Sequence, residues 1–207
     1  MTASSADRRT IALTYQETFS GGVNIDCVAV NRRVDGGPNT SSSSDDNDNS
    51  IALQIGFRGF DYFTAGDLTF STEDALVGVA RNCDVYHANH HGSRATSSGI
   101  DFLRTIDPEV TVASNGRRHG HPSADVANRL ITDIGSRFYQ TNVNPDDRAH
   151  HPDPKFVVDD TFNSDSDDEN DEGATGNITI VIDPVTSRYY VIMSGLPLTE
   201  ATFPIEF

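Results

Sequence analysis

The stretch "DVYHANHHGSRATSSGIDFLRTIDPEVTVASN", Asp84–Asn115, decides the fold expected of this chain. Its apolar residues predict a strand over 84–89, a short helix over 98–106 and a second strand over 109–115. A strand, a helix and a strand in close succession are typical of a sheet that helices cover. The stretch therefore predicts an α/β fold.

The same alternation continues on both sides of this stretch. Upstream, the pattern predicts a strand over 24–31, a hairpin over 50–68 that turns at Arg58-Gly59, and a helix over 72–80 with Thr72 as its N-cap. Downstream, it predicts three further elements, which are an amphipathic helix over 123–135 with a Ser123 cap and a Gly135 stop, a strand over 137–142, and a closing hairpin over 177–193. We expect one domain over 1–207, since a chain of this length suits a single compact unit.

Two segments are too polar to pack in that domain. "DGGPNTSSSSDDNDNS" (Asp35–Ser50) and "DDTFNSDSDDENDEGATG" (Asp159–Gly176) are dense in Ser, Asp, Asn and Gly. We expect both to be acidic, flexible insertions.

The formal charge is −16, from 24 Asp and 7 Glu against 14 Arg and a single Lys, Lys155. Such a surface stays hydrated when salt screens charge, so it fits a protein adapted to high salt. It fits equally an ordinary acidic protein with two acidic insertions. The charge disfavours passive attraction of nucleic acid, because phosphate binding draws on clustered Lys and Arg.

The two cysteines, Cys27 and Cys83, lie far apart without CxxC spacing, which argues against a zinc–thiolate site. A disulfide between them is open but unsupported, and the preferred interpretation is two buried small residues. No apolar run is long enough to cross a membrane, and the N-terminal "MTASSADRR" has no apolar segment of a secretory signal. We expect a cytoplasmic protein.

Chemistry-bearing side chains follow three of the predicted strands. Asp67 comes after "FTAG", His90 and His91 come after "DVYHAN", and "SNGRRHGHPS" (Ser114–Ser123) comes after "EVTVA". In an α/β sheet such loops converge on one edge. Asp and His are ligands that suit zinc, manganese or iron, so a metal site at this edge is chemically sensible.

Each of these residues also has a purely structural interpretation. Asp67 fits a turn or cap residue, and His119 and His121 fit a solvated turn beside Arg and Pro. For the other histidines the structural interpretation is the preferred one, namely His87 packed or exposed without function and His150 and His151 on a loop surface.

Four stretches of the chain together resemble a known family. In chain order they are "DYFTAGDLTFSTEDAL", "CDVYHANHHGSRATSSGIDFLRTIDPEVTVAS", "GRRHGHPSADVANRL" and "GNITIVID". In order and spacing they resemble the second half of the metallo-β-lactamase-fold domain of competence protein ComEC and its stand-alone relatives. The resemblance covers most of Ser50–Asp183. It implies an αββα sandwich, of which this chain would hold the C-terminal half to two-thirds.

The resemblance also implies roles for individual residues. Asp67 of the GD pair would bridge two metal ions, zinc or manganese, and His91 of HHG would bind one of them. In catalytic positions beside them, His90 would support the ligands or contact substrate and His121 of GHP would line the site. Substrate binding would fall to Ser93 and Asn115.

The family's HxHxDH segment, which supplies most of its metal ligands, does not occur in this chain. We therefore expect an N-terminally incomplete domain with an open, weak metal site and an uncovered sheet face. The leading hypothesis is a ComEC-like metallohydrolase acting on phosphodiesters such as nucleic acid. Its missing ligands would be supplied by a complementary N-terminal half on another chain or would have been lost through truncation.

Two alternatives remain. One is a non-catalytic remnant or structural subunit that binds a partner through its uncovered face. The other is an acidic calcium-binding surface protein, which is disfavoured because no DxDxDG loop with a glutamate at its twelfth position occurs.

Overall fold

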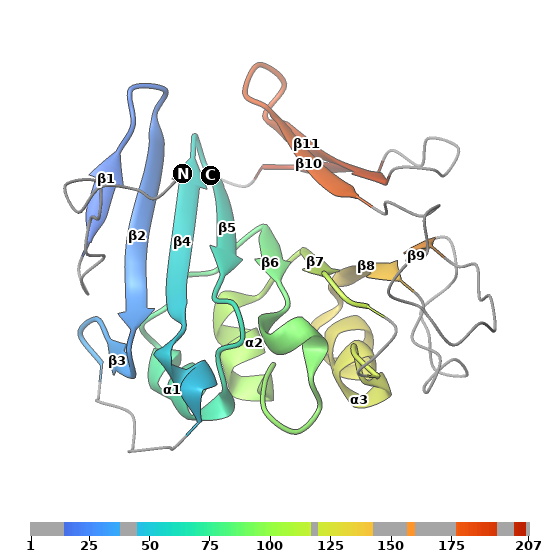
Figure 1. The fold of residues 1–207 in the computed structure, drawn as a ribbon. Coiled ribbons are helices and arrows are strands. Elements are labelled where there is room, and N and C mark those ends of the chain that lie inside the picture. The colour runs from blue at the N-terminus through green and yellow to red at the C-terminus, as the bar shows by residue number, and fades with distance from the viewer. Residues whose placement is uncertain are drawn as a thin grey trace, which may run out of the picture.

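The computed structural model describes residues 15–37, 45–116, 120–142, 157–159, 177–193 and 201–205. In these residues a large mixed sheet carries helices on one face and a smaller sheet on the other, as Figure 1 shows. This arrangement confirms the α/β class. Among the described residues no helix is both long and apolar enough to cross a membrane.

The large sheet has the order β1-β2-β4-β5-β6-β7-β8-β9 in the described part of the chain, with β3 added beside β2. Neighbouring strands are antiparallel from β1 to β5 and parallel from β5 to β9. The strands are β1 (Gln16–Thr18), β2 (Val23–Val30), β3 (Arg33–Val34), β4 (Ile51–Phe57), β5 (Phe60–Thr64), β6 (Val85–His87), β7 (Val110–Ala113), β8 (Arg137–Asn142) and β9 (Val157–Asp159). The predicted strands and the Arg58-Gly59 turn are confirmed.

Three short helices, α1 (Phe70–Leu76), α2 (Ile100–Ile106) and α3 (Ala124–Asn128), cover one face of the sheet. Their apolar residues join the sheet in one core, with Phe63, Tyr86 and Phe102 among its largest buried side chains. α3 continues as a π-helical turn over Arg129–Ile134.

The predicted caps of α3 are confirmed and that of α1 is wrong. Ser123 accepts the backbone N–H of Val126, and Gly135 ends the helix in a left-handed conformation. The helix expected to start after Thr72 instead has Thr69 as its N-cap residue, and Thr72 is fully buried inside it. Thr69 has the extended backbone that a cap position requires, which sequence spacing did not reveal.

The smaller sheet packs on the opposite face. It consists of β10 (Ile178–Asp183), β11 (Arg188–Met193) and β12 (Ala201–Pro204), so the predicted closing hairpin is confirmed. Tyr189 lies at the centre of this second core, with its ring 5.2 Å from that of Phe60 and 5.0 Å from that of Phe203. No helix covers the outer side of this sheet among the described residues, whereas an αββα sandwich would have a helical layer there.

Among the residues that the structure describes, the smaller sheet leaves part of the face that it packs on uncovered. Residues opposite one another in neighbouring antiparallel strands share a face, so Ile55 and Phe57 of β4 lie on the same side as Tyr62 and Phe60 of β5. Phe60 is buried in the second core, whereas Ile55 and Phe57 are only half-buried. Three more half-buried apolar residues continue this surface, namely Val23, Ile25 and Leu53. We call these five residues the β2–β4 face.

The end of the first acidic segment packs, contrary to the expectation that the whole of 35–50 is loose. Asp46–Asn49 form a 3₁₀-helix in which Asp48 is only 1% exposed. The Asp48 carboxylate accepts the hydroxyls of Thr69 and, at 3.1 Å, Ser71, which ties this turn to the start of α1. Residues 38–44 lie outside the described residues, and so does the second segment beyond Asp159.

The predicted state of the two cysteines is confirmed. Cys27 and Cys83 are both buried and neither forms a disulfide.

Candidate metal centre

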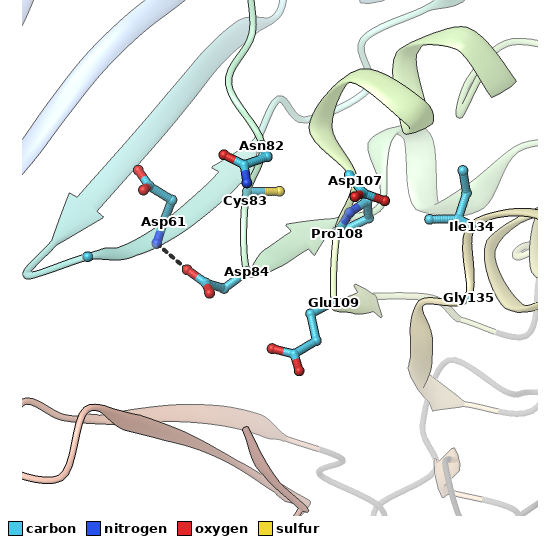
Figure 2. A pocket seen from close by; sticks show the side chains of 10 residues that line it. Asp61, Asn82, Cys83, Asp84, Asp107, Pro108, Glu109, Ile134 and Gly135 are labelled. Carbon is cyan, nitrogen blue, oxygen red and sulfur yellow. Dashed lines mark hydrogen bonds between the residues drawn. The ribbon is translucent and has the colours of Figure 1, made fainter. Parts of the chain in front are cut away.

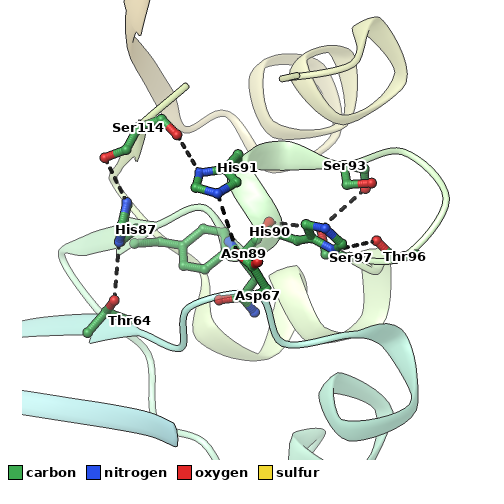
Figure 3. Close-up of polar contacts among 11 residues, drawn as sticks. Thr64, Asp67, His87, Asn89, His90, His91, Ser93, Thr96, Ser97 and Ser114 are labelled. Carbon is green, nitrogen blue, oxygen red and sulfur yellow. Dashed lines mark hydrogen bonds and ion pairs between the residues drawn. The ribbon is translucent and has the colours of Figure 1, made fainter. Parts of the chain in front are cut away.

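The carboxyl ends of the parallel strands β5, β6 and β7 bring three of the expected loops together (Figure 3). Asp67 follows β5, His90 and His91 follow β6, and Ser114 follows β7. The Nε2 atom of His91 lies 3.5 Å from Oδ1 of Asp67, and its Nδ1 lies 2.6 Å from the carbonyl oxygen of Ser114. The side chains of His91 and Asp67 are 48% and 41% exposed, so solvent reaches them.

The two histidines sit in an unusual backbone turn. His90, His91 and Gly92 have φ angles of 49°, 55° and 80°, which makes three successive left-handed residues. A residue other than glycine pays about 1–2 kcal/mol for this conformation. Such conformations persist where the surrounding structure holds them, and they cluster at functional sites.

A buried carboxylate holds both ends of the loop over 89–99, which contains this turn. Oε1 of Glu73, in α1, accepts the side-chain amide of Asn89 and the backbone N–H of Ser98, and its Oε2 accepts the N–H of Gly99, each at 2.8 Å. Glu73 is fully buried. Burial raises the pKa of Glu73 to about 7, although the three hydrogen bonds oppose the shift.

Further hydrogen bonds fix the turn from the core side. The backbone N–H of Asn89 donates to the Tyr86 hydroxyl at 2.8 Å, and that of His90 donates to the carbonyl of Gly66 at 2.9 Å. The N–H of Ser123 donates to the carbonyl of Gly92 at 3.0 Å, which joins the HHG and GHP runs. The turn is therefore over-determined, and His91 is presented rigidly toward Asp67.

The hydrogen bonding of His91 determines which of its nitrogens is available. A carbonyl oxygen only accepts, so Nδ1 of His91 carries the proton that bonds Ser114. In the neutral ring, Nε2 then carries no proton, and its lone pair faces the Asp67 carboxylate. Both groups are hydrogen-bond acceptors. Two facing acceptors need a cation between them or a proton on the ring. A histidine whose Nδ1 bonds a backbone carbonyl and whose Nε2 is directed at a carboxylate has the arrangement of a metal ligand.

His90 and His121 lie together beside this pair. Their ring centroids are 5.9 Å apart in an edge-to-face arrangement, and Nδ1 of His90 lies 2.8 Å from the hydroxyl of Thr96. Three of the other residues singled out in the sequence, His119, His150 and His151, lie outside the described part of the chain.

Ser93 and Asn115, expected to bind substrate, are each only 5% exposed. The Asn115 amide donates to the carbonyl of His121 at 3.0 Å and to that of Asn142 at 2.8 Å. In this conformation Asn115 therefore positions the His121 segment, and Ser93 has little surface to offer a substrate.

Sequence reasoning gave no role to two residues of this site. Glu73 lies within the predicted helix over 72–80 without an assigned role, although a glutamate three residues before the apolar Leu76 lies on the inward face of a helix. His87, expected to be packed or exposed without function, is half-buried, and its ring lies 3.0 Å from the Ser114 hydroxyl through Nε2 and 3.2 Å from the Thr64 hydroxyl through Nδ1. Burial, and then the nearby His91, lower the pKa of His87.

At this edge the structure brings together two candidate ligands, Asp67 and His91. Among the described residues, no group of three or more His, Cys, Asp or Glu side chains has a geometry suited to hold a metal ion. The donor set of Asp67 and His91 fits zinc or manganese in kind, while a site with these two ligands alone is open and weak.

A cavity of about 270 Å³ lies at the opposite ends of the same strands (Figure 2). Its lining includes four carboxylates, those of Asp61, Asp84, Asp107 and Glu109. Burial raises the pKa of Asp84 to about 6, and the charges of Asp61 and Glu109 add to that shift while the Asp61 backbone N–H opposes it. Because it borders the amino ends of β6 and β7, this cavity is separate from the His91 site.

Comparisons with protein-family models and with curated protein sequences gave no match to this chain.

Proposed function

We propose that this chain carries part of the metal site of a hydrolase of the metallo-β-lactamase type, similar to ComEC, whose substrates are phosphodiesters such as nucleic acid. One observation supports this above the others, namely that Nε2 of His91 faces the Asp67 carboxylate while its Nδ1 is tied to a backbone carbonyl. The strained and over-determined turn that presents His91 adds support.

In such a hydrolase the bound metal supplies a hydroxide at neutral pH and neutralises charge that develops on the substrate. The residues of this chain have three tasks around it. Asp67 and His91 hold the ion, the Ser114 carbonyl fixes the His91 ring, and His90 and His121 line the adjacent surface. With two protein ligands the chain by itself has little or no hydrolytic turnover. A complementary N-terminal half on another chain completes the site.

Metal binding is the first property to measure. We expect the purified chain to bind zinc or manganese weakly, and His91→Ala and Asp67→Ala each to lower the affinity at least about ten-fold, because each removes one of two ligands. Equilibrium dialysis with elemental analysis, in a buffer salty enough to screen the acidic surface, measures this.

Asp133→Asn is the matched control for this experiment, since Asp133 is an exposed carboxylate on the π-helical turn, away from His91. It should leave the affinity unchanged. Metal binding that is absent from the unmodified chain, or that survives both ligand substitutions, contradicts the proposed site.

A second function, that of a non-catalytic subunit, is favoured by the β2–β4 face. Its five half-buried apolar side chains form a continuous surface on two neighbouring strands. Contiguous exposed apolar surface is typical of an interaction site. In this alternative the two histidines remain from a catalytic ancestor, and function lies in the interface.

The two functions are distinguished by the effect of charging that face. If the face is an interface, sedimentation at high salt shows association that grows with concentration, and Ile55→Asp abolishes it because a charge on an apolar interface must be desolvated. Ile131→Asp, at an apolar position 39% exposed on the helical side, is the control and should leave association intact. If the chain sediments as a monomer at every concentration, and Ile55→Asp leaves its sedimentation unchanged, the subunit role is contradicted.

A further inference from the structure

A serine hydroxyl and an imidazole lie within hydrogen-bond distance beside the Asp67–His91 pair. Oγ of Ser114 is 3.0 Å from Nε2 of His87 (Figure 3). We propose that Ser114 and His87 are a nucleophile and its general base, which accept an acyl group from an activated ester without a metal ion. The proposal goes beyond the metal site, because neither side chain is one of its ligands.

The geometry orients the base for this role. Nδ1 of His87 lies 3.2 Å from the Thr64 hydroxyl. When Nδ1–H donates to Thr64, Nε2 is an acceptor and receives the Ser114 hydroxyl proton, so one tautomer satisfies both hydrogen bonds. A nucleophile, a base and a third group that orients the base is the arrangement that activates serine in unrelated proteins.

The three residues stand on a rigid support. Thr64 and His87 are the last residues of β5 and β6, and Ser114 directly follows β7. The peptide group that follows Ser114 is held by two hydrogen bonds, since the Ser114 carbonyl accepts Nδ1–H of His91 and the N–H of Asn115 donates to the Thr141 hydroxyl at 2.9 Å. Placement on adjacent strand ends keeps the reacting atoms in register.

Access and protonation suit the reaction. Ser114 is exposed, so a substrate can reach its hydroxyl, whereas His87 is half-buried behind it. Burial and the neighbouring His91 lower the pKa of His87, which keeps its ring neutral and able to take a proton at neutral pH.

The chemical step balances with an ester and water alone. Oγ of Ser114 bonds to the carbonyl carbon as its proton passes to Nε2 of His87, and the bond to the leaving alcohol breaks as that alcohol takes the proton from His87. Water then attacks the acyl-serine by the same route in reverse and releases the acid.

A fluorophosphonate probe tests the pair directly, because it forms a stable Oγ–P bond with an activated serine and releases fluoride. Peptide mass spectrometry of the full chain should locate the label on Ser114. We expect Ser114→Ala to remove it and His87→Gln to slow labelling at least about 100-fold, the range of a lost general base. Thr64→Val should slow it by less. Ser20→Ala, at an exposed serine in the β1–β2 turn, should change nothing.

Two further measurements separate this role from a folding effect and from the metal site. Imidazole added to His87→Ala should restore labelling, which a merely structural histidine would not permit. Labelling should persist in a chelator, so the absence of metal binding would leave this result untouched. Ser114 that is labelled no faster than Ser20, labelling insensitive to His87→Gln, or labelling lost in chelator overturns the proposal.

Discussion

Glu73→Ala is expected to lower the free energy of unfolding by about 3–5 kcal/mol. The Glu73 carboxylate is the buried acceptor for the Asn89 amide and for the backbone N–H groups of Ser98 and Gly99. Alanine leaves these donors without an acceptor, at a cost of about 1–3 kcal/mol for each one that water does not reach. Urea unfolding, followed by circular dichroism, measures the change.

Asp74→Ala is the matched control, because Asp74 is the next residue of α1 and its carboxylate is exposed. It should change the free energy of unfolding by no more than about 0.5 kcal/mol. If Glu73→Ala costs no more than Asp74→Ala, Glu73 does not hold the histidine turn.

The pH dependence of the same residue has a definite sign. Because burial raises the pKa of Glu73 from 4.5 to about 7, the folded protein keeps a proton that the unfolded chain releases between these values. Its contribution to stability is therefore complete below pH 4.5 and is lost as pH rises to about 7, by about 3 kcal/mol in total. Glu73→Gln cannot ionise, so its unfolding free energy should lack this decline. Parallel pH profiles of the two proteins would contradict the assignment.

Gly92→Ala is expected to cost about 2–4 kcal/mol and to weaken metal binding. Gly92 has a φ of +80°, and a Cβ there would lie 2.7 Å from Cβ and 3.2 Å from Cα of Pro122. Alanine at this position is therefore strained in the left-handed conformation, and its methyl group also pushes the HHG turn away from the GHP run. His91, one residue earlier, moves with that turn.

Gly78→Ala separates the two costs, because Gly78 has a φ of +78° and nothing within 4 Å of its Cβ position. It should cost only the backbone term, about 1–2 kcal/mol, and leave metal affinity unchanged. Thermal or urea unfolding of both variants, with dialysis against zinc, measures the difference. Equal losses in the two variants would mean that the contact with Pro122 is unimportant.

The sequence predicted local structure well where side-chain periodicity is strong. The alternation in Ile51–Phe57 and Phe60–Thr64 fixed a hairpin, and the apolar spacing with Ser123 and Gly135 fixed a helix and its ends. The sequence did not identify Thr69 as the N-cap of α1, because a cap depends on the backbone angles that the tertiary fold imposes. It failed also at Asp48, whose burial depends on two hydroxyls about twenty residues away.

The order of strands and loops in the sequence placed Asp67, His90, His91 and the Ser114 segment at one sheet edge, since parallel strands end together. Composition likewise determined the acidic character of the chain, whereas the structure decided that Cys27 and Cys83 are unpaired. Only the tertiary structure decided how these groups face each other. The bond from Asn89 to the buried Glu73, the Ser114 carbonyl that orients His91 and the contact between His87 and Ser114 all join residues distant in sequence. Such long-range contacts leave no periodic signal, because they depend on where separate strands end in space rather than on neighbouring residues.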